Sequence, residues 1–276
     1  MSPPASAVRP LASDAPVLLR EDDRGIALLT LNRPQARNSL SEAMLHALGD
    51  TLAAIAADRG VRAVVLTGNG PVFSAGHDLK ELTAHRADPD RGRAYYKQLM
   101  DACGAVMQMI VRLPQPVIAA VQGTATAAGC QLVATCDLAV ASSAAKFATP
   151  GVNIGLFCST PMVALSRNLA RKHAMEMLLT GDMIPAADAL RMGLVNRVVA
   201  PGTERAEALA LAATIASKST LTVRTGKEAF YRQLEMDLAS AYAYASQVMV
   251  ENMLARDAEE GIGAFIEKRA PKWEDK

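Results

Sequence analysis

The stretch Val117-Ile-Ala-Ala-Val-Gln-Gly-Thr-Ala-Thr-Ala-Ala-Gly-Cys-Gln-Leu-Val-Ala-Thr-Cys-Asp137 decides the fold of this chain. Its apolar start, Val117 to Val121, is typical of a buried strand. A bend at Gln122-Gly123 leads through small residues into a helical pattern that ends near Cys136. A strand, a tight turn and a helix in this order direct backbone N–H groups and the positive end of a helix dipole at one place. The stretch therefore predicts a site that stabilises an anion, because small side chains let a ligand approach the backbone closely.

Strand and helix patterns alternate on both sides of this stretch, up to about residue 200. Upstream we expect strands at 17–20, 26–31 and 62–67, the first two joined by a hairpin turn. Ser39-Leu-Ser-Glu42 fits a capping box, which predicts a helix through about Ala57. From residue 204 onward there is no strand pattern, and we expect three or more helices. The fold class is therefore α/β, with a C-terminal all-helical region.

The division of the chain follows from the same patterns. Residues 1–14 are rich in Pro, Ala and Ser and lack the apolar core of a signal peptide, so we expect a disordered tail there. The α/β body is predicted over 15–202 and the helical region over 203–276. No apolar run is long enough to span a bilayer, and we expect no membrane insertion.

Charge and cysteine content exclude several classes of function. The formal net charge is +1, which gives no electrostatic footprint for nucleic acid or for an anionic membrane. None of the four cysteines forms a C-x-x-C pair, and the four histidines are not set among them at metal-ligand spacings. We therefore expect no metal site, and buried free thiols in a reducing compartment.

A second turn before a helix lies in Phe73-Ser-Ala-Gly-His-Asp-Leu-Lys-Glu81. Backbone N–H groups near Gly76-His77 and near Ala128-Gly129 could converge on one oxygen atom, which is the arrangement of an oxyanion hole. The chain has no complete dinucleotide fingerprint, no P-loop and no G-x-S-x-G elbow. An α/β oxidoreductase is therefore disfavoured.

Several motifs occur in order from about residue 17 to the end of the chain. They are Leu31-Asn-Arg-Pro-Gln-Ala-Arg-Asn38, Phe73-Ser-Ala-Gly-His-Asp-Leu-Lys-Glu81, Pro116-Val-Ile-Ala-Ala-Val-Gln-Gly123, Gly129-Cys-Gln-Leu132 with Cys136-Asp137, Leu179-Thr-Gly-Asp182, and Ala264-Phe-Ile-Glu-Lys-Arg269. Together they resemble the enoyl-CoA hydratase/isomerase (crotonase) family. The resemblance implies a crotonase-type spiral of ββα units, whose C-terminal helices assemble the chain into a homotrimer or a dimer of trimers.

The resemblance also implies the ligand, an acyl-CoA or enoyl-CoA thioester. Coenzyme A would enter as part of the substrate, and no tightly bound cofactor is implied. In the family, two N–H groups bind the thioester oxygen, and they correspond to the backbone N–H of His77 and that of Ala128, with Gly129 next to it. The family usually has Gly at the place of Ala128, and an Ala keeps the N–H if its φ is negative.

The coenzyme contacts that the resemblance implies fall in three places. The loop at Ala75, with His77, Asp78, Leu79 and Lys80, would wrap the adenine and the pantetheine. Ala36 and Arg37 would lie along the coenzyme, and Phe265 and Lys268 would cap its nucleotide end from a neighbouring subunit. For Lys80 and Lys268 the rival interpretation is an ordinary solvated helix charge.

The chain departs from the family at both acids that hydratases use. The first glutamate corresponds to Gln131, which cannot accept and return a proton at neutral pH. The second corresponds to Gly151, which has no side chain. General acid–base groups are worth about 10²–10⁴ in rate. We therefore expect weak hydratase activity, although the thioester would still be polarised. Residues 149–161 resemble the enoyl-CoA hydratase domain-containing protein 3 group, which also lacks the acid pair.

Other interpretations remain open from the residues alone. One is an acyl-CoA-binding or scaffold protein without turnover, and another is a thioester hydrolase that uses a site water. Cys158 could be a nucleophile, but no base is placed near it and a packed thiol is the better interpretation. Asp78 and Asp137 are interpreted as structural. The expected location is cytoplasmic for a bacterial-like protein and the mitochondrial matrix for a eukaryotic one.

Overall fold

A six-stranded sheet forms the centre of the computed structural model, which describes residues 15–276; the tail expected over 1–14 lies outside the described residues. The strand order is β1-β2-β3-β5-β7-β10, in which β1 and β2 form an antiparallel hairpin and the other pairs are parallel. The strands are β1 Leu18–Asp23, β2 Ile26–Leu31, β3 Ala63–Gly68, β5 Val117–Val121, β7 Leu138–Ser142 and β10 Arg197–Val199.

In a second, four-stranded sheet, three strands each follow a strand of the first sheet directly along the chain, and the fourth, Ile184–Pro185, pairs antiparallel at the edge. Its members are β4 Val72–Ser74, β6 Thr124–Thr126, β8 Lys146–Ala148 and β9 Ile184–Pro185. The chain thus repeats one unit, in which a strand of the large sheet is followed by a strand of the small sheet and then by a helix. The turns of successive units touch, because a Cβ on Gly123 would overlap the carbonyl oxygen of Pro71. This repeat confirms the predicted spiral of ββα units.

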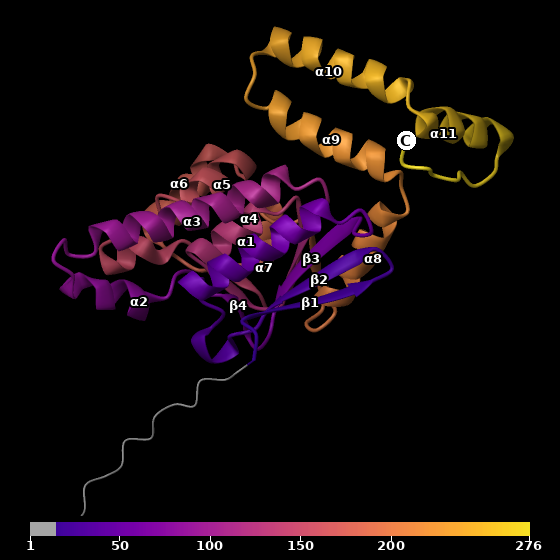
Figure 1. Ribbon diagram of the computed structural model, residues 1–276. Coiled ribbons are helices and arrows are strands. Elements are labelled where there is room, and N and C mark those ends of the chain that lie inside the picture. The colour runs from indigo at the N-terminus through magenta and orange to yellow at the C-terminus, as the bar shows by residue number, and fades with distance from the viewer. Residues whose placement is uncertain (1–14) are drawn as a thin grey trace, which may run out of the picture.

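Helices cover both faces of the large sheet (Figure 1), and the described residues contain the following α-helices. They are α1 Glu42–Ala57, α2 Leu79–Ala84, α3 Arg93–Arg112, α4 Ala128–Thr135, α5 Pro161–Asn168, α6 Arg171–Thr180, α7 Ala186–Met192, α8 Glu204–Ala216, α9 Thr220–Gln233, α10 Leu238–Met253 and α11 Arg256–Glu267, with short 3₁₀ turns at Pro34–Ala36, His85–Ala87 and Pro150–Ile154. The larger core includes side chains of α1, α3 and α4, and a smaller core lies under α8, where Ala208 and Ala212 meet Ile118 and Val140. α8 therefore belongs to the packed body.

One detail of the predicted helix start is wrong. The N-cap of α1 is Ser41, whose hydroxyl accepts the N–H of Met44, and not Ser39. The chain is still extended at Leu40, which pairs with His77 in an isolated parallel bridge. Ser39 instead donates its hydroxyl to Asp78 at 3.1 Å, so the segment before α1 is held against the loop that starts α2.

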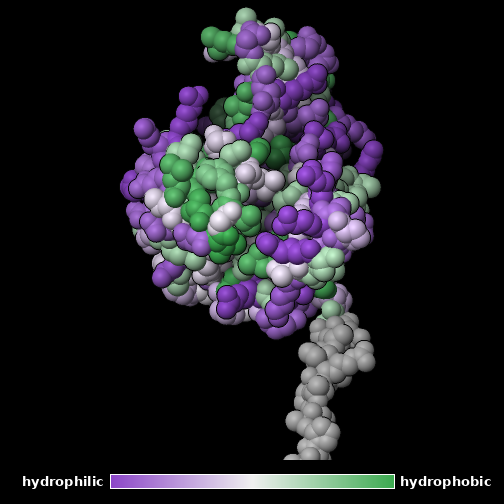
Figure 2. Space-filling view, turned by 90° about the vertical axis from the view of Figure 1, so that its left-hand side faces the viewer, coloured by the Kyte–Doolittle hydropathy of each residue, from purple (hydrophilic) through white to green (hydrophobic). Residues whose placement is uncertain are grey.

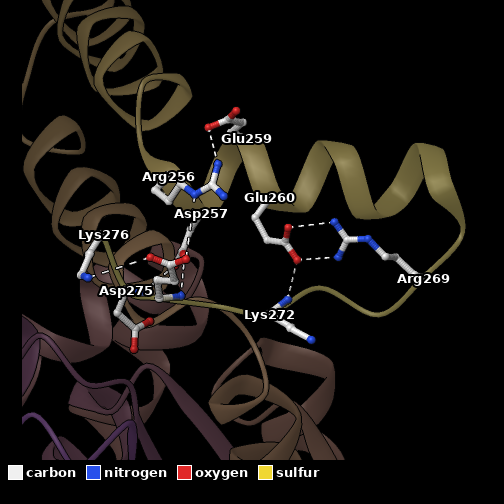
Figure 3. Close-up of polar contacts among 9 residues, drawn as sticks. Arg256, Asp257, Glu259, Glu260, Arg269, Lys272, Asp275 and Lys276 are labelled. Carbon is white, nitrogen blue, oxygen red and sulfur yellow. Dashed lines mark hydrogen bonds and ion pairs between the residues drawn. The ribbon is translucent and has the colours of Figure 1, made fainter.

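The helices α9, α10 and α11 extend from the body as an arm (Figure 1). The end of the chain returns along α11, where Glu260 accepts two hydrogen bonds from Arg269 and one from the N–H of Lys272, while Asp257 accepts the N–H groups of Glu274 and Asp275 (Figure 3). Trp273 then donates to the carbonyl oxygen of Ser217 at 2.9 Å, between α8 and α9. Within residues 15–276 no helix combines the length and the apolarity that crossing a membrane requires.

Candidate functional site

The loop between β4 and α2 lies against the turn between β6 and α4. Gly76 has φ of +88°, and a Cβ built on it would lie 2.9 Å from the Cβ of Ala127 and 3.1 Å from the backbone nitrogen of Ala128. Only glycine combines this conformation with this close approach. The structure therefore brings together the two turns that the sequence singled out.

The second turn is strained. Ala127 has φ of +50° and ψ of −122°, a conformation that a residue with a Cβ rarely adopts and that costs about 1–3 kcal/mol. Its N–H donates to the carbonyl oxygen of Ala148 at 2.9 Å, which fixes it in place. The positive φ is therefore that of Ala127. Ala128 is the first residue of α4 and its φ is not positive, which is the condition under which an Ala at this position keeps its N–H available.

The N–H groups of His77 and Ala128 have no acceptor among the described residues. In a parallel bridge the bonds run to the neighbours of the paired residue. The bridge of Leu40 with His77 therefore leaves the N–H of His77 out. The N–H of Ala128 belongs to the first helical turn, where no carbonyl oxygen of the helix can accept it. Two unused donors on touching turns can bind one partly negative oxygen atom.

The imidazole of His77 adds a feature that the sequence did not reveal. Its Nδ1 lies 3.1 Å from the carbonyl oxygen of Leu40, which can only accept, so Nδ1 carries the proton. Burial lowers the pKa of His77, against the smaller raising effect of this hydrogen bond, and the ring is therefore neutral near pH 7. Its Nε2 is a buried acceptor without a partner.

Asp78 holds the loop in shape. Its carboxylate caps α2 by accepting the N–H of Lys80 at 3.1 Å, accepts the hydroxyl of Ser39, and lies 3.6 Å from the guanidinium of Arg33. Leu79 and Lys80, which follow it, are exposed. The interpretation of Asp78 as structural is consistent with these contacts.

The segment of Ala36 and Arg37 lies beside the same loop. The N–H of Ala75 donates to the carbonyl oxygen of Arg37 at 3.0 Å. The buried Asn38 then bonds the carbonyl oxygens of Asn69 and Val72 at 2.9 and 2.8 Å, which ties this segment to the turn between β3 and β4. Two of the three places predicted to contact the coenzyme are thus adjacent, and Asn38 is an anchor that the sequence did not single out.

The third predicted place lies on the arm. Phe265 is in α11, with 85 % of its surface exposed, and Lys268 ends this helix with φ of +56°. Figure 1 shows α11 away from α2, on the other side of the molecule. One chain therefore does not bring Phe265 or Lys268 to the loop at His77.

The two positions that correspond to lost acids differ in how much room they have. Gln131 is 4 % exposed in α4, and its Oε1 is buried without a partner. At Gly151 a Cβ would lie 2.9 Å from Sγ of Cys158 and 2.9 Å from the carbonyl oxygen of Leu156. The first position therefore carries an unpaired amide, and the second is closed by the chain itself.

The four cysteines are free and buried, as predicted. Burial raises the pKa of the Cys103 and Cys130 thiols to about 12 and also raises those of Cys136 and Cys158. Thiolates are scarce at such values, which favours the packed-thiol interpretation of Cys158. Over residues 15–276 no group of three or more His, Cys, Asp or Glu side chains could hold a metal ion.

Asp137, the last residue of the stretch that opened the sequence analysis, is held by the arm. It accepts hydrogen bonds from Lys227 at 2.6 Å and from Tyr231 at 2.9 Å, both in α9. Ninety residues separate Asp137 from Lys227, so no local pattern could have revealed this contact.

The chain is similar to known proteins along most of its length. Residues 21–276 match the family model described as Enoyl-CoA hydratase/isomerase. The rat protein named "Enoyl-CoA hydratase domain-containing protein 3, mitochondrial" is 50% identical over 254 residues, which cover 92% of this chain and 83% of the rat protein. A solved enoyl-CoA hydratase from Mycobacterium smegmatis has 56% identity and a TM-score of 0.89, covering 94% of this chain and 99% of that one. Human enoyl Coenzyme A hydratase domain-containing protein 3 has 48% identity and a TM-score of 0.89, covering 93% and 100%.

Proposed function

The chain belongs to the enoyl-CoA hydratase/isomerase family, and we propose that it binds an acyl-CoA thioester and polarises the thioester carbonyl between the N–H groups of His77 and Ala128. The observation that carries this proposal is the contact of Gly76 with Ala127 and Ala128, which joins two turns with unused N–H donors. Removing one such donor from an oxyanion hole typically costs about 10²–10³ in rate. The developing charge of an enolate-like oxygen is the charge that these donors would stabilise.

The coenzyme would lie along the adjacent segments at Ala36–Arg37 and Ala75–Lys80. The exposed side chains of Lys80 and Arg37 supply positive charge there, and the shape of the loop is maintained by Asp78. Phe265 and Lys268 would reach the nucleotide end only from a neighbouring subunit, since their own chain holds them on the arm.

We further propose that the chain hydrates enoyl-CoA slowly. Gln131 can orient a water molecule or a carbonyl group but cannot carry a proton at neutral pH. Gly151 supplies no group, and the place of its side chain is filled by Cys158 and Leu156. The site would thus keep electrostatic stabilisation of the thioester and lack two proton carriers, each worth about 10²–10⁴ in rate.

A second candidate function is binding of acyl-CoA without hydration, and the closed space at Gly151 favours it. Two measurements separate the candidates. Calorimetry with butyryl-CoA reports binding, and the loss of enoyl absorbance of crotonyl-CoA reports hydration. Release of free coenzyme A thiol would instead reveal a hydrolase. Absence of any acyl-CoA binding would overturn both candidates, and hydration at the rate of a two-glutamate enzyme would overturn our interpretation of Gln131 and Gly151.

We propose that the chain forms a homo-oligomer through the arm. Large apolar side chains are exposed along it, among them Phe230, Leu238, Leu254, Phe265 and Ile266. The body exposes others near α5 and α6, including Ile154, Leu156, Phe157, Val163 and Leu179. Figure 2 shows apolar surface both on the body and on the arm above it. A trimer or a dimer of trimers would cover such surface, and sedimentation of the purified protein measures the state.

The location of the protein is proposed from its relatives alone. The rat and human relatives are named as mitochondrial proteins, and the solved relative from Mycobacterium smegmatis is bacterial. For a bacterial chain we propose the cytoplasm and for a eukaryotic one the mitochondrial matrix. Immunofluorescence or cell fractionation in the source organism tests this.

A further inference from the structure

A buried cluster at the end of α4 joins the arm to the body. The ammonium of Lys227 in α9 lies 2.6 Å from Oδ2 of Asp137 and also donates to the carbonyl oxygens of Ile110 at 3.0 Å and Gln115 at 3.1 Å. All three of its hydrogen-bond donors are therefore used, and its side chain is only 7% exposed. One side chain of the arm thus connects the end of α3, the approach to β5 and the end of α4.

Asp137 is satisfied from several sides. Besides the ammonium of Lys227, its Oδ1 accepts the hydroxyl of Tyr231 at 2.9 Å and its Oδ2 accepts the N–H of Val117 at 2.7 Å. Burial, and then the charge of Asp137, raises the pKa of Tyr231, so this hydroxyl stays a donor. Burial also lowers the pKa of Lys227, an effect that the Asp137 carboxylate opposes. Such a cluster keeps one arrangement, because the departure of any partner would leave a buried charge unpaired.

The helix between this cluster and the thioester site is short and enclosed. α4 runs from Ala128 to Thr135, all eight of its residues are buried, and at 1.5 Å per residue it is about 12 Å long. At its N-terminal end, Gly129 lies so close to Ser74 that a Cβ would overlap the Ser74 carbonyl oxygen. Asp137 follows two residues after its last turn. The helix is therefore fixed at one end by β4 and at the other by the arm.

We propose that Lys227 and Tyr231 are positioning residues for the thioester site: through Asp137 they fix α4 along its axis and so place the N–H of Ala128. The proposal rests on the proposed function insofar as this N–H binds the thioester oxygen. It also makes the site depend on the arm, since α9 supplies both side chains. A purely structural latch differs in its consequences, because its loss lowers stability without altering the polarisation of a bound carbonyl group.

The test uses the full chain and the variant Tyr231→Phe, which removes one hydroxyl and keeps the ring. Tyr242→Phe in α10 is the matched control, since Tyr242 is 70% exposed and has no hydrogen-bond partner within the part of the chain that the structure describes. The first readout needs no ligand. It is the hydrogen exchange of the Gln131 amide, which closes the first turn of α4 by donating to the carbonyl oxygen of Ala127 at 3.0 Å.

We expect Tyr231→Phe to speed this exchange by about tenfold to a hundredfold, because the variant removes a hydrogen bond to a charged group. Tyr242→Phe should leave it unchanged. The second readout is the infrared carbonyl band of butyryl-CoA labelled with ¹³C at the thioester carbon. Polarisation lowers this frequency in the parent protein, and we expect Tyr231→Phe to lose part of that shift while the affinity for the coenzyme portion stays within about threefold.

Lys227→Met provides a stronger perturbation of the same cluster. If this variant folds, we expect a larger loss of both signals than in Tyr231→Phe; if it does not fold, Tyr231→Phe decides alone. Unchanged exchange of the Gln131 amide together with an unchanged carbonyl band in folded Tyr231→Phe would overturn the proposal. A parent protein that binds butyryl-CoA without any carbonyl shift would overturn the proposed function, while the exchange of Gln131 would still report whether the arm positions α4.

Discussion

Replacing Gly151 with glutamate restores the residue type that the family resemblance implies, and we expect it to destabilise the fold without restoring hydration. The backbone of Gly151 is outside the left-handed region, so its conformation admits a side chain. Space does not: the Cβ would lie 2.9 Å from Sγ of Cys158, 2.9 Å from the carbonyl oxygen of Leu156 and 3.3 Å from the N of Cys158. The turn that would have to open is closed by a hydrogen bond of 2.9 Å from the N–H of Leu156 to the carbonyl oxygen of Gly151.

The size of the effect follows from two contributions. Overpacking a filled site costs about 1–3 kcal/mol in the free energy of unfolding. A carboxyl group buried beside a carbonyl oxygen, with no donor, adds about 1–3 kcal/mol. We therefore expect Gly151→Glu to lower the free energy of unfolding by about 2–6 kcal/mol. For a chain of this size that lowers the melting temperature by roughly 4–24 °C.

The assay combines thermal melting with the hydration of crotonyl-CoA, followed by the loss of enoyl absorbance. Gly226→Glu in α9 is the matched control, because a Cβ there meets nothing within 4 Å. We expect the control to melt within about 2 °C of the parent, since surface substitutions usually stay within ±0.5 kcal/mol. Gly151→Glu combined with Cys158→Ala should lose less stability than the sum of the single variants, by about 1 kcal/mol, because one of the two contacts is relieved.

One result would refute the reasoning. That result is a Gly151→Glu variant with the melting temperature of the parent and hydration of crotonyl-CoA faster by a factor of about 10² or more. The segment from Gly151 to Cys158 would then be able to move aside, and the absence of the side chain at position 151 would alone explain the weak hydration. Under our interpretation the whole segment has closed over the position.

Three further predictions concern the loops and the chain end. Because burial lowers the pKa of His77, the folded protein resists protonation of this ring, so its contribution to stability is complete above pH 6.5 and falls as the pH drops below that value. His77→Asn, which keeps a donor toward Leu40, should therefore lose less stability than the parent between pH 7 and 5 in urea titrations. Ala128→Pro removes the N–H of Ala128 at the first position of a helix, and should abolish most of the carbonyl shift of bound butyryl-CoA, whereas Arg171→Pro at the first position of α6 should not. Asp257→Asn weakens the acceptor of two N–H groups in the last residues, and should expose residues 270–276 to carboxypeptidase several-fold faster than in the parent.

The sequence predicted those parts of the fold that depend on local patterns. The strand at Val117–Val121 was placed to the residue, because a run of apolar residues buried on both faces has few alternatives. The cap of α1 was misplaced by two residues, because the glutamate that completes a capping box stands three residues after Ser39, whereas in the structure the hydroxyl of Ser39 is engaged by the distant Asp78 and Ser41 caps the helix. The expectation that Ala36 and Arg37 contact the coenzyme came from the family resemblance and not from the local pattern, and it stays a prediction.

Long-range features of the site could not be read from the sequence. Gly151 shows only that a side chain is absent, and it takes the structure to show that Cys158 and Leu156 occupy its place. The contact between Asp137 and Lys227 likewise depends on how α9 leaves the body. The imidazole of His77 was considered only for its backbone, and its buried Nε2 follows from the position of Leu40.

Several features of this site are unfavourable for stability, as expected of the thioester site proposed above. Ala127 holds a conformation that costs about 1–3 kcal/mol. Nε2 of His77 and Oε1 of Gln131 are buried without partners, and leaving such a group unpaired costs about 1–3 kcal/mol. Ala127 and His77 lie on the turns that meet at Gly76, and Gln131 lies in the first turn of α4, three positions after Ala128. Buried polar atoms without a partner also occur elsewhere in the described residues, for example on Arg62 and Thr220. Beside two unused N–H donors, such atoms and a strained backbone are expected where a ligand supplies the missing partners. An acyl thioester has the acceptor oxygen that the N–H groups need. A water molecule bound beside the thioester could donate hydrogen bonds to Nε2 of His77 and Oε1 of Gln131. These two acceptors therefore also favour a ligand with a hydrogen-bond donor near its carbonyl group.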